Sequence, residues 1–162
     1  MINQKMQDAM NEQIREELES AYIYLSMSAY FSAEGWDGMA AWMQKQSQEE
    51  MGHAMKFYNH ILERGGRAIV PGIKQPQKEW ASPLAAFQAA YAHEQHITGT
   101  IHKLVKLATE LNDYASNSLL TWFVDEQVEE EDSTSKVVQM LERIGDSGNG
   151  MYMLDHNLGA RQ

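Results

Sequence analysis

The sequence contains no cysteine among its 162 residues. This absence excludes disulfide bonds, zinc–thiolate sites, iron–sulfur clusters and thiol nucleophiles, and it fits a reducing cytoplasm. Proline is scarce as well, since only three are present. Two of these, Pro71 and Pro76, fall in one segment between regions of helical pattern. That segment is therefore the natural place for a long connection.

Long hydrophobic runs and basic residues are also lacking. No apolar run approaches the length of a membrane span, and the N-terminal stretch has no signal-peptide core, so we expect a cytoplasmic protein without a membrane partner. Lys and Arg number 13 against 23 Asp and Glu, for a net charge of −10. This balance argues against nucleic acid as a partner and is compatible with attracting cations. The length and the 43% hydrophobic content fit a single globular domain over residues 1–162.

Helical periodicity covers most of the chain. Apolar residues recur in alternating steps of three and four, as in helices that pack into a bundle. The pattern predicts helices over residues 6–32, 36–64 and 83–111, and a fourth whose apolar positions extend from 116 to 144. Ser82 followed by Pro83 is a typical helix start. A glycine-rich turn over 145–150 and a short fifth helix over 151–158 complete the prediction.

The proline-containing connection, residues 65–82, is long enough to cross a bundle from end to end. A helix of roughly 28 residues is about 42 Å long at 1.5 Å per residue. Extended residues cover up to about 3.3 Å each, so this segment can span that distance. The sequence therefore predicts an all-α four-helix bundle with one long crossover loop and a short fifth helix.

Polar residues interrupt each apolar seam near the middle of its helix, and the interruptions repeat. The first two helices contribute Glu17, Glu50 and His53, and the next two contribute Glu94, Gln127 and Glu130. In both sets, 33 residues separate the first member from the second, and 36 separate the first from the third. The pattern therefore predicts two helical hairpins with the same spacing of polar residues, which meet in a single layer.

Several carboxylates in a dry layer would repel one another unless a cation balanced them. A single buried glutamate is more often paired with Lys, Arg or His, but no Lys or Arg occupies a seam position in this layer. Glu50 and His53 are three residues apart and lie on one helical face. Four carboxylates with one imidazole favour iron or manganese over structural zinc, and the ligands suffice for two ions bridged by Glu50.

Four stretches of the chain resemble the bacterial non-haem ferritins, and the resemblance extends over nearly its whole length. They are Glu16-Glu17-Leu18, Gln48-Glu49-Glu50-Met51-Gly52-His53, His93-Glu94-Gln95 and residues 122–130. The resemblance implies a ferritin-like fold and a hollow homo-oligomer of 24 subunits. It also implies iron storage by ferroxidase activity, in which Fe(II) is oxidised by O₂ or H₂O₂ and kept as a ferric mineral.

The same resemblance implies roles for individual residues. The implied iron ligands are Glu17, Glu50, His53, Glu94 and Glu130. Gln127 would hydrogen-bond beside the metal. Tyr24 lies on the same seam as Glu17 and matches a family tyrosine whose role would be electron donation. An ordinary core aromatic is the alternative for Tyr24.

Further acidic residues next to this set resemble the third iron site of bacterial ferritins. They are Glu49, Glu126 and Glu129. A solvated acidic face is the alternative, because residues 129–132 form a charge run. Met51 matches the position of the haem-ligating methionine of bacterioferritins. Their second Glu-x-x-His is Gln127-x-x-Glu130 here, and methionine also occurs in haem-free relatives, so we expect iron without haem.

Three rival functions remain open at this level. A rubrerythrin-type peroxidase would react with peroxide without storing iron, although the chain lacks the Cys-x-x-Cys tail of that family. A shell could bind metal without oxidising it. The mini-ferritins that protect DNA place their metal centre between subunits, whereas the repeat here predicts a centre within one bundle.

Overall fold

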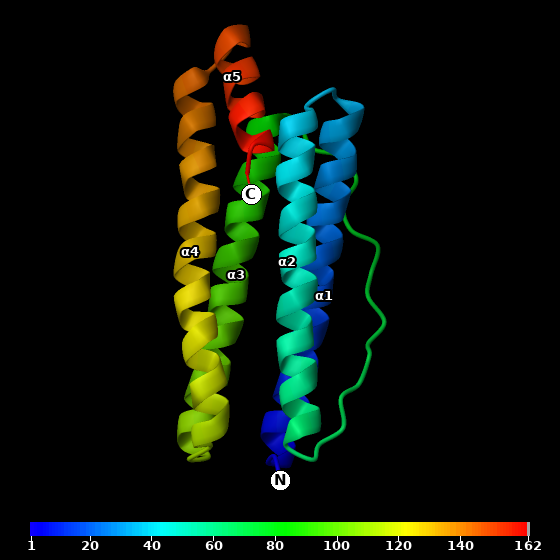
Figure 1. The fold of residues 1–162 in the computed structure, drawn as a ribbon, viewed down its shortest axis with the longest axis vertical. Helices are drawn as coiled ribbons and strands as arrows, with labels where there is room; N and C mark the ends of the chain where they lie inside the picture. Colours follow the sequence, from blue (N-terminus) through cyan, green and yellow to red (C-terminus); the bar gives the residue numbers. More distant parts are fainter. Residues whose placement is uncertain (162) are drawn as a thin grey trace.

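Five α-helices account for most of the computed structural model, which describes residues 1–161. They are α1 (Gln4–Ala33), α2 (Asp37–Glu63), α3 (Pro83–Glu110), α4 (Tyr114–Ile144) and α5 (Gly148–Gly159). α1 and α2 form one hairpin, α3 and α4 form a second, and α5 lies at one end (Figure 1). Residues 1–161 contain no strand, so the predicted all-α bundle is confirmed. Within the same residues, no helix is both long and apolar enough to cross a membrane.

The crossover between the hairpins, residues 64–82, extends along the outside of α1 from one end of the bundle to the other (Figure 1). Asn11 fixes it near its start, because its side chain donates to the Arg67 carbonyl at 3.0 Å and accepts from the Ile69 amide at 2.7 Å. Ser26 fixes it further along by donating to the Gln77 carbonyl at 2.5 Å. The predicted long crossover is therefore present and anchored.

Local capping sets the helix ends. Ser82 accepts a hydrogen bond from the Ala85 amide at 3.1 Å, which confirms the predicted start of α3. The fifth helix differs from the prediction, because it begins at Gly148 and not at residue 151. There the side chain of Ser147 accepts from the Gly150 amide at 3.2 Å. This cap offsets the low helix propensity of the glycines, which the sequence pattern alone had assigned to a turn.

Two hydrophobic clusters fill the bundle interior on either side of the polar layer. One includes Phe31 and Phe87, and the other includes Phe57 and Phe123. Each of these rings is fully buried. Burial of such a side chain stabilises the fold by about 1.5–3 kcal/mol. The bundle can therefore tolerate a polar layer because apolar packing above and below it supplies the stability.

Candidate metal centre

The six polar seam residues lie together between these two clusters. Their exposed fractions are 1% for Glu17, 1% for Glu50, 4% for His53, 1% for Glu94, 3% for Gln127 and 5% for Glu130. Each of the four bundle helices contributes at least one of them. The structure therefore brings together every residue of the repeated pattern in one buried layer.

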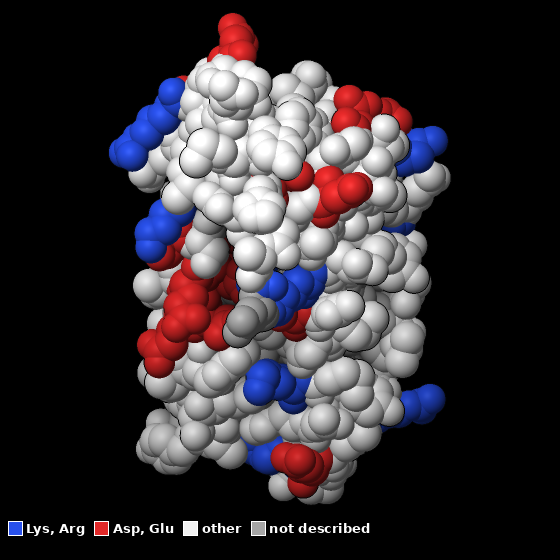
Figure 2. Space-filling view, turned by 45° about the horizontal axis from the view of Figure 1, so that its top comes forward, with Lys and Arg blue, Asp and Glu red and all other residues white. Residues whose placement is uncertain are grey.

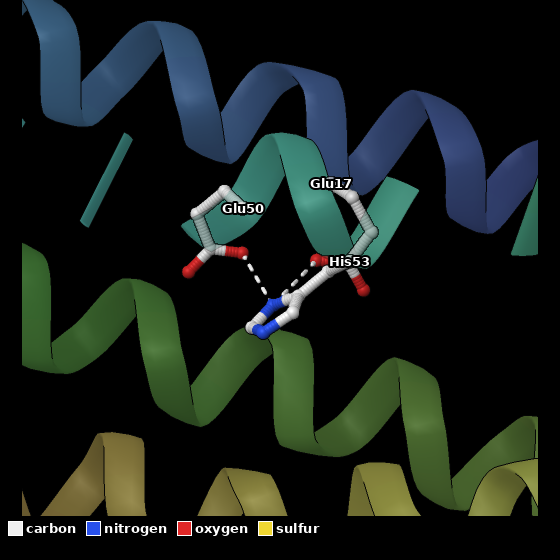
Figure 3. A group of neighbouring side chains, drawn as sticks. All are labelled: Glu17, Glu50 and His53. Carbon is white, nitrogen blue, oxygen red and sulfur yellow. Dashed lines mark hydrogen bonds and ion pairs between the residues drawn. The ribbon is translucent and has the colours of Figure 1, made fainter. Parts of the chain in front are cut away.

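The first hairpin supplies a group of two carboxylates and one imidazole (Figure 3). His53 Nδ1 lies 3.1 Å from Glu50 Oε2 and 3.9 Å from Glu17 Oε2. One ligand atom from each of the three residues lies within 4.8 Å of the others, so a single ion could contact all three.

A second group of potential ligands shares a member with the first. Glu50, Glu94 and Glu130 also offer oxygens that lie within 4.8 Å of one another. Glu50 thus belongs to both groups and is placed to bridge two ions. A third group joins His53, Glu126 and Glu130, because Glu126 Oε1 comes within 3.5 Å of His53 Nε2.

Burial dominates the electrostatics of the layer. It raises the pKa of the Glu17 and Glu50 carboxyls well above the usual range, and repulsion from neighbouring carboxylates adds to it. It also raises the pKa of Glu94 and of Glu130 to about 7. Glu17 Oε2 and Glu50 Oε1 are buried without a hydrogen-bond partner among the described residues. A bound cation would favour the ionised carboxylates and contact these two oxygens.

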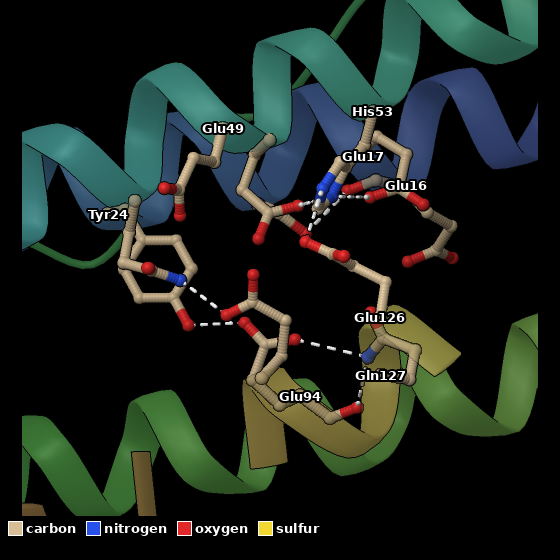
Figure 4. A network of polar contacts seen from close by, with 12 residues as sticks. Glu16, Glu17, Tyr24, Glu49, His53, Glu94, Glu126 and Gln127 are labelled. Atoms are coloured by element: carbon tan, nitrogen blue, oxygen red, sulfur yellow. Dashed lines mark hydrogen bonds and ion pairs between the residues drawn. The ribbon is translucent and has the colours of Figure 1, made fainter. Parts of the chain in front are cut away.

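Hydrogen bonds orient the carboxylates of the second hairpin (Figure 4). Tyr24 donates its hydroxyl hydrogen bond to Glu94 Oε1, and Gln127 Nε2 donates to Glu94 Oε2 at 3.2 Å. Burial, followed by the nearby Glu94 carboxylate, raises the pKa of the Tyr24 phenol well above its usual value. Tyr24 is therefore a neutral donor that holds Glu94 in place.

Two glutamines in this network were not among the predicted site residues. Gln13 Nε2 donates to Glu17 Oε1 at 2.8 Å, and Gln46 Nε2 donates to Glu130 Oε2 at 2.7 Å. Both are buried. Gln46 could have been found from the sequence, because it is a polar residue on the apolar seam one turn before Glu50. Gln13 lies beside its seam, and only its spacing of four from Glu17 points to it.

The three additional acids do not converge in the structure. Glu126 faces His53, whereas Glu49 Oε2 forms an ion pair with Arg161 Nη2 at 2.8 Å and Glu129 is exposed. Within residues 1–161, no group of three candidate ligands includes Glu49 or Glu129. Figure 2 shows acidic side chains gathered over part of one face of the molecule, with basic side chains beside them.

Comparisons with known proteins agree with this geometry. The model of the ferritin-like domain family matches residues 7–144. A bacterial non-heme ferritin from Bacteroides fragilis is 44% identical over 161 residues, which is 99% of this chain and 100% of that protein. One from Staphylococcus epidermidis is 39% identical and covers 99% of this chain and 97% of its own length.

A solved structure is equally similar. The open pore ferritin of the hyperthermophilic archaeon Archaeoglobus fulgidus superposes with a TM-score of 0.99 and 45% sequence identity over 100% of both chains. The predicted resemblance to the bacterial non-haem ferritins is thereby confirmed. The chain belongs to the ferritin-like domain family.

Proposed function

We propose that this protein stores iron and oxidises Fe(II) at a di-iron centre inside each helical bundle. Membership of the ferritin-like family supports storage as the function. The observation that carries the ferroxidase proposal is the position of Glu50, which belongs to two adjoining ligand groups in a buried layer. Two Fe(II) ions held on either side of one carboxylate can together deliver two electrons to an acceptor.

In the proposed reaction, two Fe(II) ions reduce O₂ with two protons to H₂O₂, or reduce H₂O₂ with two protons to two water molecules. The ions become Fe(III) and leave for storage as a mineral. Glu17 and His53 bind one ion, Glu94 and Glu130 bind the other, and Glu50 contacts both.

The neighbouring side chains have supporting roles in this proposal. Gln127 and Tyr24 fix the orientation of Glu94 through their hydrogen bonds. When only the ion at Glu17 and His53 is bound, Tyr24 supplies the second electron for the reduction of O₂ to H₂O₂, and its phenol proton passes to Glu94. The three acids Glu49, Glu126 and Glu129, which do not converge in the structure, provide a third iron site on the way to the cavity of a shell of 24 subunits once the side chains of Glu49 and Glu129 turn toward Glu126.

Anaerobic loading with Fe(II), followed by a pulse of oxygen, tests the ferroxidase proposal. The parent should consume oxygen as the absorbance of ferric iron rises. Glu50→Ala and His53→Ala should oxidise iron at least about 100-fold more slowly, because each removes a ligand. Glu63→Ala, which changes an exposed glutamate on the same helix, is the matched control. Equal rates in all variants would show that the centre is wrongly placed.

Native mass and oxygen consumption separate the rival functions. A dimer that consumes peroxide without retaining iron would favour a rubrerythrin-type peroxidase. A shell that binds Fe(II) without consuming oxygen would be a metal buffer.

A further inference from the structure

Arg161, which follows α5, contacts the face of α2 beside the metal centre. Its Nη2 lies 2.8 Å from Glu49 Oε2, and its Cζ lies 4.8 Å from the centroid of the Trp42 ring. Trp42 is 5% exposed, so the guanidinium lies against a buried ring while it pairs with the carboxylate. A guanidinium over an aromatic face is an attractive arrangement in addition to the ion pair.

Close packing of α5 against the start of α2 fixes the position of Arg161. Asp155 Oδ1 accepts a hydrogen bond from the Met39 amide at 2.8 Å. A Cβ on Gly38 would lie 1.7 Å from the Asp155 carbonyl oxygen, and one on Gly159 would lie 3.0 Å from Gly38 Cα. The two helices can approach this closely only because both positions are glycine. The close packing of α5 against α2 therefore places the Arg161 guanidinium beside Glu49.

Glu49 is close enough to influence the centre without belonging to it. It directly precedes Glu50, and no dashed line joins it to the other side chains drawn in Figure 4. If the Glu49 side chain turned toward the neighbouring group of His53, Glu126 and Glu130, it would add an oxygen ligand to that group.

We propose that Arg161 is a positioning residue that holds the Glu49 carboxylate away from iron. Its guanidinium competes with a third metal ion for this carboxylate. This inference rests on the proposed function. A guanidinium and a metal cation cannot both occupy the same carboxylate oxygen, so an ion that binds Glu49 must displace Arg161. The contact is displaceable, because Glu49 is partly exposed and Arg161 Nη1 is buried without a hydrogen-bond partner among the described residues.

Anaerobic titration of the assembled protein with Co(II), a probe that oxygen-free buffer leaves unoxidised, tests this competition. Ions bound per subunit and their affinities are measured by calorimetry for the parent, Arg161→Ala, Arg161→Lys and Glu49→Gln. In Arg161→Ala the third ion should bind about two- to fivefold more tightly, the range expected for a partly exposed ion pair. The first two ions should bind as in the parent. Arg161→Lys keeps the charge and should stay close to the parent.

The double variant Arg161→Ala with Glu49→Gln separates competition from loosened packing. Competition requires Glu49, so Arg161→Ala should have no effect on the third ion when residue 49 is glutamine. The inference is overturned if Arg161→Ala raises the affinity for the third ion in the Glu49→Gln background as well. It is also overturned if Arg161→Ala alone does not raise that affinity. If Arg161→Ala fails to assemble by native mass, Arg161→Gln replaces it, because that side chain is uncharged yet long enough to cover Trp42.

The same titration distinguishes the two levels of failure. A parent that does not bind the first two ions contradicts the proposed function itself. A parent that binds both, with a third ion indifferent to Arg161, contradicts only the role of Arg161.

Discussion

The two helical hairpins meet in one polar layer but prepare their carboxylates in different ways. In the hairpin of α1 and α2, Glu17 and Glu50 each keep a buried oxygen without a hydrogen-bond partner among the described residues. In the hairpin of α3 and α4, both oxygens of Glu94 accept hydrogen bonds, and Glu130 accepts one from Gln46. The first hairpin therefore depends more on a cation than the second does.

The pKa values follow the same division. Burial raises those of Glu17 and Glu50 well above the usual range, and mutual repulsion adds to the effect. Burial also raises those of Glu94 and Glu130, but only to about 7, because donated hydrogen bonds favour their ionised forms. Burial therefore favours the neutral carboxyl in both hairpins, and the donated hydrogen bonds offset part of this effect at Glu94 and Glu130.

Two single variants, each of which removes one metal ligand from one hairpin, should give the largest changes in metal affinity. Glu17→Ala should weaken the ion beside His53 by about 100-fold, and Glu94→Ala should weaken the other ion to a similar degree. Anaerobic metal titration with calorimetry measures both. Glu110→Ala, an exposed change on α3, is the control. Loss of both ions from either single variant would contradict the division into two ligand groups.

The pH dependence of stability tests the second hairpin. The pKa of Glu130 is about 7 in the folded chain against 4.5 when exposed, so the folded state binds the extra proton between these values. The stability that this group contributes is complete below pH 4.5 and is lost as the pH rises through 7. Metal-free Glu130→Gln does not titrate, and its amide oxygen can still accept from Gln46. At pH 8 it should exceed the parent in unfolding free energy by on the order of 2 kcal/mol.

Urea unfolding in the presence of a chelator, at pH 8 and at about pH 4.5, measures this difference. The advantage of Glu130→Gln should shrink toward zero at the lower pH. Glu129→Gln, an exposed neighbour on the same helix, should show little change at either pH. An equal advantage at both values would mean that Glu130 is not the titrating group.

The two ions should also differ in affinity, because only one ligand group contains a nitrogen donor. Titration of the metal-free parent should resolve two steps, and the ion beside His53 should bind more tightly. Two steps of equal affinity would contradict the predicted difference between the two ligand groups.

Tyr24→Phe should give the smallest effect. It removes a single hydrogen bond to Glu94, which is worth about 0.5–1.5 kcal/mol. The ion at Glu94 should bind about three- to tenfold more weakly, while the ion beside His53 stays unchanged. Calorimetry on metal-free protein checks both, and Tyr22→Phe is a matched control at an exposed tyrosine of the same helix. Equal weakening of both ions would indicate a general packing defect.

The repeated spacing of polar residues in the seams was enough to predict which side chains share the buried layer. Period and composition could do this because a helix fixes the direction of every third and fourth side chain. The same reasoning predicted the long crossover, since its length had to match that of the bundle. The predicted start of α5 was wrong, because the side chain of Ser147 caps the helix and allows it to begin at Gly148.

Contacts that depend on side-chain conformation were beyond the sequence. The Gln13 and Gln46 hydrogen bonds require particular rotamers, although Gln46 stands on a seam. The ion pair between Glu49 and Arg161 joins residues 112 positions apart, and it depends on how closely α5 approaches α2. No pattern of periodicity encodes that distance, so the separate position of Glu49 could be found only in the structure.

The crossover along α1 has a consequence for chain topology. It is the only peptide connection between the two hairpins, and it carries no described side-chain hydrogen bond between residues 70 and 76. A cut there would turn the folded chain into a complex of two separate polypeptides. Each polypeptide would carry half of the ligands, so metal would strengthen the association of two chains. The iron affinity of this layer would then determine how far added iron lowers the dissociation constant between them.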